Sequence, residues 1–494
     1  MINQLTDFIG EQITPFNIFV ATLLFVNILF GISMIFIERR SAQSVWAWLL
    51  VLFFLPGLGF ILYLVFGRRI YNEDLFKADE TVQRNLEEHV QQQMQKLRNR
   101  EFILENPIYQ KYYKLVHLLL YSNHAYVTVN NEITTYTDGN VKFDALLEDI
   151  KNAKHHIHFQ YYIFKLDGLG KKLYNAMIEK QKEGVEVRIL YDDIGSRSLN
   201  MRNFRKLKKA GGHVYAFFPN KLPLINFRLN NRNHRKIVVI DGEIGYTGGF
   251  NVGEEYVGQS EKFGYWRDTH LRVKGDAVKA LQRRFMMDWN SQEKREQLKY
   301  QDAFFPNVDY KGNVPMQIGS SGPTEHFQQI KFSYIKMIAT AQHSIHIQSP
   351  YFIPDQSFSE ALKMAILSGI EVKIMIPSFP DHPFVYWGTY ANAGFFAELG
   401  AKVYVYKKGF LHQKILIVDD EVLSVGTTNI DNRSFALNFE INTFIYSIDE
   451  AVKHRKIFEK DIEDSELLTP KIYNERGKMI RFKEAIANLI APIL

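Results

Sequence analysis

The sequence predicts two similar α/β domains, each a mixed β-sheet flanked by helices, preceded by a pair of membrane-spanning helices. Three observations predict this fold. Two long apolar runs open the chain, a set of segments from its middle recurs in the same order near its end, and β-branched runs alternate with polar helical stretches. With 494 residues, the chain is long enough to form two or more packed domains.

The N-terminal apolar runs are expected to form a transmembrane helical hairpin. They cover about residues 16–37 and 45–66, and about 20 helical residues cross the hydrocarbon core of a bilayer. A pair of arginines follows each run, as is typical of a membrane interface. Pro56, Gly57 and Gly59 are expected to kink the second span or to make it partly re-entrant.

The charges near the spans favour a multi-pass protein of the cell membrane with a cytoplasmic main domain. Arg39 and Arg40 lie between the spans, whereas Arg68, Arg69 and Lys77 follow the second span. A cleaved signal peptide is not expected, because acidic rather than basic residues precede an apolar run of this length.

The composition excludes several kinds of site. The chain contains no cysteine, which excludes disulfides, thiolate zinc sites, iron–sulfur clusters and a cysteine nucleophile. Lys and Arg number 60 and Asp and Glu 54, and the resulting net charge of +6 suits an anionic partner such as phospholipid or nucleic acid. A net charge this small does not distinguish between these two kinds of partner.

After the apolar runs, the two halves of the chain repeat each other. The matching segments are IHFQYYIF (157–164) and IHIQSPYF (345–352), VEVRILYDD (185–193) and IEVKIMIPS (370–378), and GGHVYAF (211–217) and GAKVYVY (400–406). A repeat of this length indicates a duplicated domain. The expected division is a membrane hairpin at 1–70, a linker or surface helix at 71–124, a first domain at 125–300 and a second domain at 301–494.

Each half contains the same motif, which is histidine, any residue, lysine, any four residues and aspartate. The motif residues are His234, Lys236 and Asp241 in the first half and His412, Lys414 and Asp419 in the second. Residues two apart in a strand share a face, so each histidine and its lysine are expected to converge on one site. The aspartates have the opposite parity and lie at turn signals, so we expect them to support the fold of the motif and not to contact phosphate.

If the chain turns at each aspartate, the returning strand brings small residues opposite the histidine and lysine. These residues are Gly248 and Gly249 in the first half and Gly426 and Thr427 in the second. They are expected to leave room for a phosphate, with Thr427 either adding a hydroxyl donor or filling space. Asn251 and Asn429 follow their histidines at equal spacing and are expected to donate hydrogen bonds to a phosphate oxygen.

Two histidines suit displacement at a phosphodiester through a covalent intermediate. One histidine supplies the nucleophile, and the other supplies the general acid on the opposite side of the phosphorus. The two lysines and two asparagines would neutralise charge on the phosphoryl oxygens, so we expect no metal ion or other cofactor.

The paired motifs resemble those of the phospholipase D superfamily, whose members carry two such HKD motifs. The stretches 263–275, 348–355, 409–420 and 425–440, together with the N-terminal spans, are similar to the bacterial cardiolipin synthase family. The resemblance covers essentially the whole chain. It implies two phospholipase D-like domains related by a pseudo-two-fold axis.

The resemblance also implies a phosphatidyl transfer between two phosphatidylglycerol molecules, which yields cardiolipin and glycerol through a phosphatidyl-histidine. On this basis His234 is the nucleophile, and His412 is the acid that protonates glycerol and then activates the incoming hydroxyl. In the superfamily a downstream carboxylate orients each motif histidine, and the matching positions here are Asp268 and Glu440. An anionic membrane surface is an expected partner, and nucleic acid is not.

Residues 194–240 contain many basic side chains, no acidic ones and several apolar residues. The basic residues are Arg197, Arg202, Arg205, Lys206, Lys208, Lys209, Lys221, Arg228, Arg232, Arg235 and Lys236. We expect this segment to lie on an anionic leaflet and to guide lipid into the site. The alternative is a solvated basic helix followed by a core loop.

Three other functions remain open. A phospholipase D hydrolase shares the first half-reaction and uses water as the acceptor. A membrane-tethered nuclease would use the same histidines on nucleic acid, although nucleases of the superfamily are commonly shorter and lack the hairpin. A catalytically inactive membrane scaffold would be expected to have lost a motif residue, whereas both motifs here are complete.

Overall fold

The computed structural model describes residues 14–36, 42–55, 57–67, 73–76, 78–101, 107–219, 230–292, 296–379, 381 and 383–490. The chain divides into two compact units. One comprises Met1–Ile70, Asn220–Asn230 and Ile490–Leu494, and the other comprises Tyr71–Pro219 and Asn231–Leu489.

The N-terminal unit contains a bent helical hairpin. Its helices are α2 (Pro15–Phe36), α3 (Ala42–Phe54), α4 (Leu58–Leu62) and the π-helical turn η1 (Tyr63–Gly67). The amide of Asn27 in α2 donates to the carbonyl of Leu52 in α3 at 3.4 Å. The ring of Phe30 packs edge-on against Phe60 at 4.6 Å, which joins α2 to α4.

The first expected span coincides with α2, the one helix among the described residues that is long and apolar enough to cross a membrane. The second expected span is not continuous. Helix α3 ends at Phe54, Gly57 has a left-handed φ of 84°, and α4 begins at Leu58. The expected kink is therefore present at Gly57, whereas Pro56 lies outside the described residues.

The larger unit contains two similar halves, each built on a mixed sheet. The first half contains β1 (Glu132–Tyr136), α8 (Gly139–Asn152), β2 (His156–Tyr161), α9 (Gly168–Lys182), β3 (Glu186–Asp192), α10 (Arg205–Lys209), β4 (His213–Phe217), β5 (Ile237–Ile240), β6 (Ile244–Gly248), η3 (Glu254–Val257), β7 (Tyr265–Arg267), β8 (His270–Lys274) and α11 (Ala277–Gln292). Its seven-stranded sheet has the order β1-β8-β6-β5-β2-β3-β4.

The second half follows a short turn, η4 (Asp302–Phe304). It contains β9 (Met316–Ser321), α12 (Gln329–Thr340), β10 (Ser344–Gln348), β11 (Phe352–Ile353), α13 (Gln356–Leu367), β12 (Glu371–Pro377), α14 (Pro383–Glu398), β13 (Lys402–Tyr406), β14 (Gly409–Leu411), β15 (Ile415–Val418), β16 (Val422–Gly426), β17 (Ile430–Asp431), α15 (Asn432–Ala436), β18 (Glu440–Tyr446), α16 (Ile448–Glu463), β19 (Ser465–Leu468), α17 (Pro470–Asn474) and α18 (Lys478–Ile490). Its eight-stranded sheet has the order β19-β13-β12-β10-β15-β16-β18-β9.

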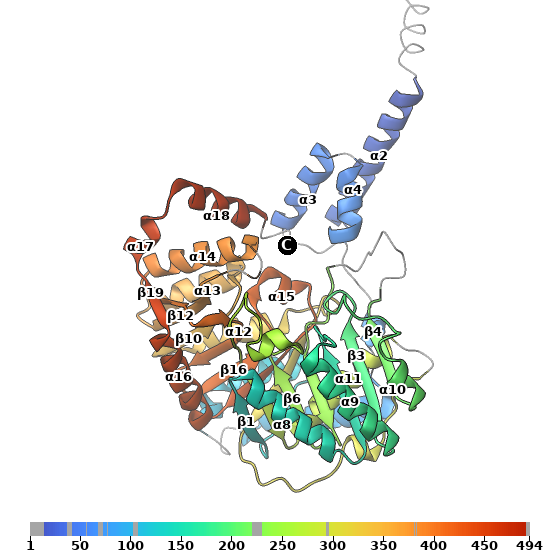
Figure 1. The fold of residues 1–494 in the computed structure, drawn as a ribbon. Coiled ribbons are helices and arrows are strands. Elements are labelled where there is room, and N and C mark those ends of the chain that lie inside the picture. Colours follow the sequence, from blue (N-terminus) through green and yellow to red (C-terminus); the bar gives the residue numbers. More distant parts are fainter. Residues whose placement is uncertain are drawn as a thin grey trace, which may run out of the picture. The chain divides into compact units, whose positions relative to one another are not determined.

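The two sheets share the order of seven strands, and β19 is an additional edge strand of the second sheet. The shared order confirms the duplication that the repeat predicts. Strands β1, β8, β6, β5, β2, β3 and β4 correspond in order to β9, β18, β16, β15, β10, β12 and β13. In both halves a central strand pairs in parallel on one side and antiparallel on the other. Figure 1 shows α8, α9 and α11 in the half that contains β6, and α12, α13 and α14 in the half that contains β16.

The segment expected to be a linker or surface helix is helical, with η2 (Glu73–Phe76), α5 (Glu80–Arg98) and α7 (Ile108–Asn123). Helix α7 is not a linker, because Leu115 and Leu119 are fully buried in the hydrophobic core of the second half. Apolar residues recur along α7 at helical spacing, so one face of the helix packs beside α12.

Backbone pairing joins the two halves. Strand β7 of the first half pairs in parallel with β14 of the second half. A single β-bridge also links Asn233 of the first half to Phe439 of the second half. Both contacts lie next to motif histidines, so the two motifs meet where the halves join.

Candidate active site

Both motif histidines are held by the backbone of the opposite half. The His234 amide donates to the carbonyl of Phe439 at 2.9 Å, and the His412 amide donates to the carbonyl of Arg267 at 2.8 Å. The sequence predicted that His234 and His412 lie within strands. In the structure both histidines lie just before a strand, His234 before β5 and His412 before β15. The reason is that the chain leaves its own sheet at this point in order to pair across the interface.

Each histidine side chain is oriented by a carboxylate from the other half. His234 Nδ1 lies 2.9 Å from Glu440 Oε2, and His412 Nδ1 lies 2.6 Å from Asp268 Oδ2. Both carboxylates are completely buried. A carboxylate accepts a hydrogen bond, so Nδ1 is the donor and Nε2 is left for chemistry. The downstream carboxylates therefore act across the interface, and neither contacts the histidine of its own half.

Burial keeps both imidazoles neutral at pH 7. It lowers the pKa of His234 to about 4. The charge of Glu440 raises this pKa and that of Lys236 lowers it further. It lowers the pKa of His412 to about 3, where Lys414 adds to the effect and Asp268 opposes it. A neutral imidazole is the nucleophilic form.

The motif lysines are buried beside the histidines. Lys236 Nζ donates to the carbonyl of His234 at 2.7 Å, and Lys414 Nζ donates to the carbonyl of His412. Burial lowers the pKa of Lys236 to about 7 and that of Lys414 to about 8. The charge of Lys414 also lowers the pKa of Lys236, so the two lysines lie within electrostatic range of each other. A bound phosphate would stabilise their charged forms.

The motif aspartates hold a turn and lie away from the histidines. Asp241 accepts hydrogen bonds from the consecutive amides of 154–156 at 2.8 to 3.0 Å. Asp419 accepts three from 342–344 at 2.7 to 2.9 Å, and Lys111 donates to it at 2.6 Å. Both aspartates have a left-handed φ, of 56° and 55°. These contacts agree with the structural role that their parity indicates.

The small residues of the returning strand make room for protein groups, which corrects the expectation that they leave space for phosphate. A Cβ atom at Gly249 would lie 1.8 Å from Asp268 Oδ1, and one at Gly248 would lie 2.5 Å from the Thr269 carbonyl. A Cβ at Gly426 would lie 2.3 Å from the Asn442 side chain. Glycine is required at these positions because neighbouring groups occupy the space of a side chain.

Thr427 supports the carboxylate that orients His234. Its hydroxyl donates to Glu440 Oε2 at 2.6 Å and accepts from the Ile441 amide at 3.0 Å. Of the two roles considered for this side chain, the structure shows a hydroxyl donor, directed to Glu440.

The two asparagines are buried near the motifs. Asn251 Oδ1 accepts a hydrogen bond from the Ile163 amide at 3.2 Å. Asn429 is 4% exposed, and its Oδ1 has no hydrogen-bond partner in the described part of the chain. Their expected role as phosphate donors stays a prediction.

Two buried arginine–aspartate pairs support the site, and the sequence analysis missed both. Arg235 donates to Asp288 at 2.7 Å and to the carbonyl of Glu440 at 3.0 Å. Arg267 binds Asp461 with two bonds of 2.8 Å. Both arginines lie next to site residues in the sequence, Arg235 beside His234 and Arg267 beside Asp268. Each is paired because an unpaired charge in the interior would be strongly destabilising.

The basic segment is only partly a surface. Arg232, Arg235 and Lys236 are buried at the site, which corrects their assignment to a membrane-facing surface. The basic side chains of α10 are exposed. Residues 220–229 of this segment, including Lys221 and Arg228, lie outside the described residues.

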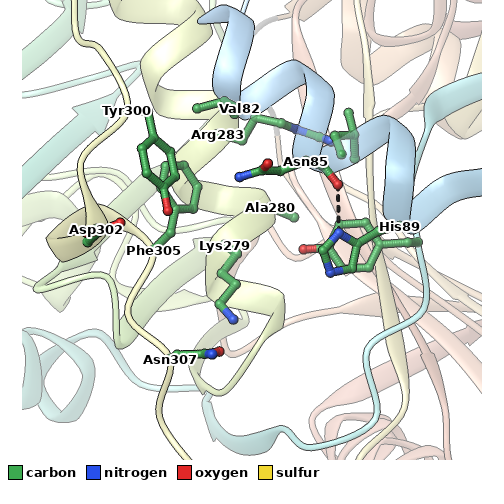
Figure 2. A pocket seen from close by; sticks show the side chains of 12 residues that line it. Val82, Asn85, His89, Lys279, Ala280, Arg283, Tyr300, Asp302, Phe305 and Asn307 are labelled. Atoms are coloured by element: carbon green, nitrogen blue, oxygen red, sulfur yellow. Dashed lines mark hydrogen bonds between the residues drawn. The ribbon is translucent and has the colours of Figure 1, made fainter.

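A cavity of about 370 Å³ lies elsewhere, between α5, α11 and the segment around η4. Figure 2 shows its lining, including His89, Lys279 and Tyr300. Neither motif histidine lines it, so this cavity is not the site of phosphoryl chemistry.

Comparisons with known proteins agree with this geometry. The family model described as "Cardiolipin synthase, PLD-like domain" matches residues 146–289 and 334–462, which contain both motifs. The chain belongs to this family. The model of the phospholipase D-nuclease N-terminal region matches residues 21–68.

The relatives of this family member extend over nearly its whole length. A cardiolipin synthase of Staphylococcus aureus strain Mu50 is 54% identical over 97% of both chains. Cardiolipin synthase 1 of Staphylococcus epidermidis is 51% identical over 95% of this chain and 96% of its own. A solved structure, the phosphatidylserine synthase of Haemophilus influenzae, is similar in fold, with a TM-score of 0.59, 15% identity and coverage of 77% of this chain and all of that one.

Proposed function

We propose that this family member is a cardiolipin synthase that transfers a phosphatidyl group between two phosphatidylglycerol molecules. The observation that carries the proposal is the pair of histidines, each held at Nδ1 by a buried carboxylate of the other half and each with a buried lysine bonded to its carbonyl. The named relatives, at 51% to 54% identity, support this choice of reaction.

In the first step, the donor phosphate binds near Lys236 and Lys414, and His234 Nε2 attacks the phosphorus. The anionic phosphodiester offsets the lysine charges and raises the pKa of His412, which allows this histidine to carry a proton. His412 gives its Nε2 proton to the glycerol oxygen as the phosphorus–oxygen bond breaks. The products are phosphatidyl-His234, neutral His412 and free glycerol.

In the second step, a second phosphatidylglycerol enters in place of glycerol. His412 takes the proton of its headgroup hydroxyl, and the resulting oxygen attacks the phosphorus. The phosphorus–nitrogen bond breaks, cardiolipin leaves, and both histidines return to their starting states. Glu440 and Asp268 stabilise each imidazole when it carries positive charge and keep Nε2 directed at the phosphorus.

The products formed from labelled lipid test this proposal. Purified protein in detergent is incubated with headgroup-labelled phosphatidylglycerol and no divalent metal. Cardiolipin and glycerol in equal amounts are expected. Phosphatidic acid with glycerol would show that water is the acceptor and that the protein is a hydrolase.

We also propose that the N-terminal unit anchors the protein in the cell membrane as a multi-pass segment, with the catalytic unit in the cytoplasm. The apolar exposed surface of α2 supports the anchoring in the membrane. The basic residues that follow the second apolar run support the orientation. Protease added outside sealed, right-side-out vesicles is expected to leave the catalytic unit intact. Digestion of that unit under these conditions would contradict the orientation.

A further inference from the structure

Helix α18 packs on the second half through one narrow face. Glu484 and Ala487 are its buried residues, at 3% and 2% exposure. Arg476 binds Glu484 at 2.8 Å, and Ala487 lies against Gly388 of α14. Figure 1 shows α17 and α18 beside α14 at the outside of this half. The remaining surface of α18 faces away from the protein core.

The surface opposite the packed face is apolar. Met479, Phe482, Ile486 and Leu489 are 66%, 62%, 36% and 74% exposed. Their spacing of three, four and three residues places them in one stripe along the helix. Water would have to solvate this whole stripe in the isolated unit, which is unfavourable for side chains of this size.

Basic residues border the stripe, and acidic residues do not. At about 100° per residue, Lys478 lies at one edge of the stripe and Lys483 at the other, with Arg481 further round the helix. The one carboxylate of α18 belongs to Glu484, which is buried and paired. The exposed surface of the helix is therefore apolar in the middle and positive at its sides.

We propose that α18 is an interfacial helix that inserts its apolar stripe into an anionic lipid leaflet. The stripe reaches the boundary between headgroups and acyl chains, and the lysines bind headgroup phosphates from either side. The choice of an anionic leaflet rests on the proposed function, whose substrate is an anionic lipid. A second copy of the chain fits this surface less well, because an isologous contact would bring the bordering lysines of both copies together.

This docking would fix the catalytic unit on the leaflet independently of α2. A second point of attachment holds a unit in a more defined orientation than one tether does. The role of α18 is thus to set the orientation of the unit relative to its lipid substrates.

The absence of cysteine makes a direct test possible in the full-length protein. The variant Phe482→Cys carries a single thiol, to which an environment-sensitive fluorophore is attached before reconstitution into vesicles of phosphatidylglycerol and phosphatidylcholine. The matched control is Ile448→Cys on α16, where the native side chain is 58% exposed. Spin-labelled acyl chains are expected to quench the fluorophore at 482 strongly and that at 448 weakly.

Equal quenching at both positions would overturn the proposal. Efficient disulfide cross-linking between two Phe482→Cys chains, without quenching by lipid, would also overturn it in favour of a second copy. Quenching in protein that forms no cardiolipin would leave this proposal standing and would count against the proposed function alone.

Charge variants provide a second measurement. Replacing Lys478 and Lys483 with Gln is expected to lower the ratio of docked to free helix about fivefold for each lysine on anionic vesicles. The same variants are expected to have little effect on vesicles of phosphatidylcholine alone. An equal effect on both kinds of vesicle would contradict the role of the lysines.

Discussion

His234 Nδ1 donates to the carboxylate of Glu440, a residue 206 positions further along the chain and in the opposite half of the catalytic unit. The same relationship exists in reverse between His412 and Asp268, at 2.6 Å. Neither half can orient its own histidine. The duplication therefore yields one site with two interdependent imidazoles, and not two independent sites.

Removing the charge of either carboxylate is expected to reduce kcat strongly. Glu440→Gln and Asp268→Asn preserve size, but an amide does not fix the imidazole tautomer or stabilise the imidazolium. The comparable change in a histidine–aspartate dyad lowers kcat by about 10⁴-fold, and a loss on that order is expected here. Steady-state kinetics with phosphatidylglycerol measure this effect. A normal kcat in both variants would contradict the orienting role.

The support around Glu440 and Asp268 differs between the halves. Thr427→Val removes the 2.6 Å bond to Glu440 and is expected to lower kcat by about tenfold, the equivalent of one hydrogen bond to a charged group. Gly249→Ala is expected to have a larger effect, because its Cβ would displace the Asp268 carboxylate. Gly477→Ala, between α17 and α18, is the control, since a Cβ there meets nothing within 4 Å and the residue has no left-handed φ.

Binding of the anionic substrate is expected to weaken as pH rises through the range of the lysine pKa values. Burial lowers the pKa of Lys236 to about 7 and that of Lys414 to about 8, so both lysines lose their charge at higher pH in the empty site. The KM for phosphatidylglycerol should therefore rise above about pH 8. In Lys236→Arg this rise is expected to be smaller, because arginine keeps its charge at high pH. A KM that rises equally in the variant and in the native protein would contradict the contact between lysine and phosphate.

Acid is expected to destabilise the catalytic unit through the two histidines. The folded-state pKa values are about 4 and about 3, below the 6.5 of an unfolded histidine. The unfolded state therefore takes up protons first as pH falls from 6.5 to about 4, which lowers the free energy of unfolding across this window. Thermal unfolding at pH 7.5 and pH 5 measures this loss. The double variant His234→Gln and His412→Gln should lose less stability between these pH values.

Asp419 is expected to matter for folding more than for chemistry. Asp419→Asn weakens bonds to three backbone amides and Lys111, which is expected to lower the free energy of unfolding by about 2 to 4 kcal/mol. The neighbouring Asp420→Asn removes a partly exposed pair with Arg455 and should cost less than about 1 kcal/mol. A variant at 419 with normal stability and no activity per folded molecule would contradict the structural role.

The repeat and the motif spacing predicted most of the fold and the central residues of the site. Strand alternation is a local property, so the segments around β2, β3 and β4 and their counterparts could be recognised from the sequence. Helix α7 was taken for part of a linker or surface helix, because its amphipathic pattern does not reveal which core its apolar face joins.

The sequence could not reveal how the two halves support each other. The crossed contacts of Glu440 and Asp268 depend on how the sheets meet, and no local pattern encodes that arrangement. For the same reason Gly249 was taken as room for phosphate, whereas its missing side chain makes room for the Asp268 carboxylate.

The most direct test of the two-histidine mechanism is the mass of the trapped protein–lipid adduct. The donor is a phosphatidyl ester with an acidic phenol as its leaving group, which departs without a general acid. A phosphatidyl adduct on His234 is expected in His412→Ala, and no adduct is expected in His234→Ala. An adduct on His412 in His234→Ala would reverse the two roles, and no adduct in either variant or in the native protein would contradict covalent catalysis.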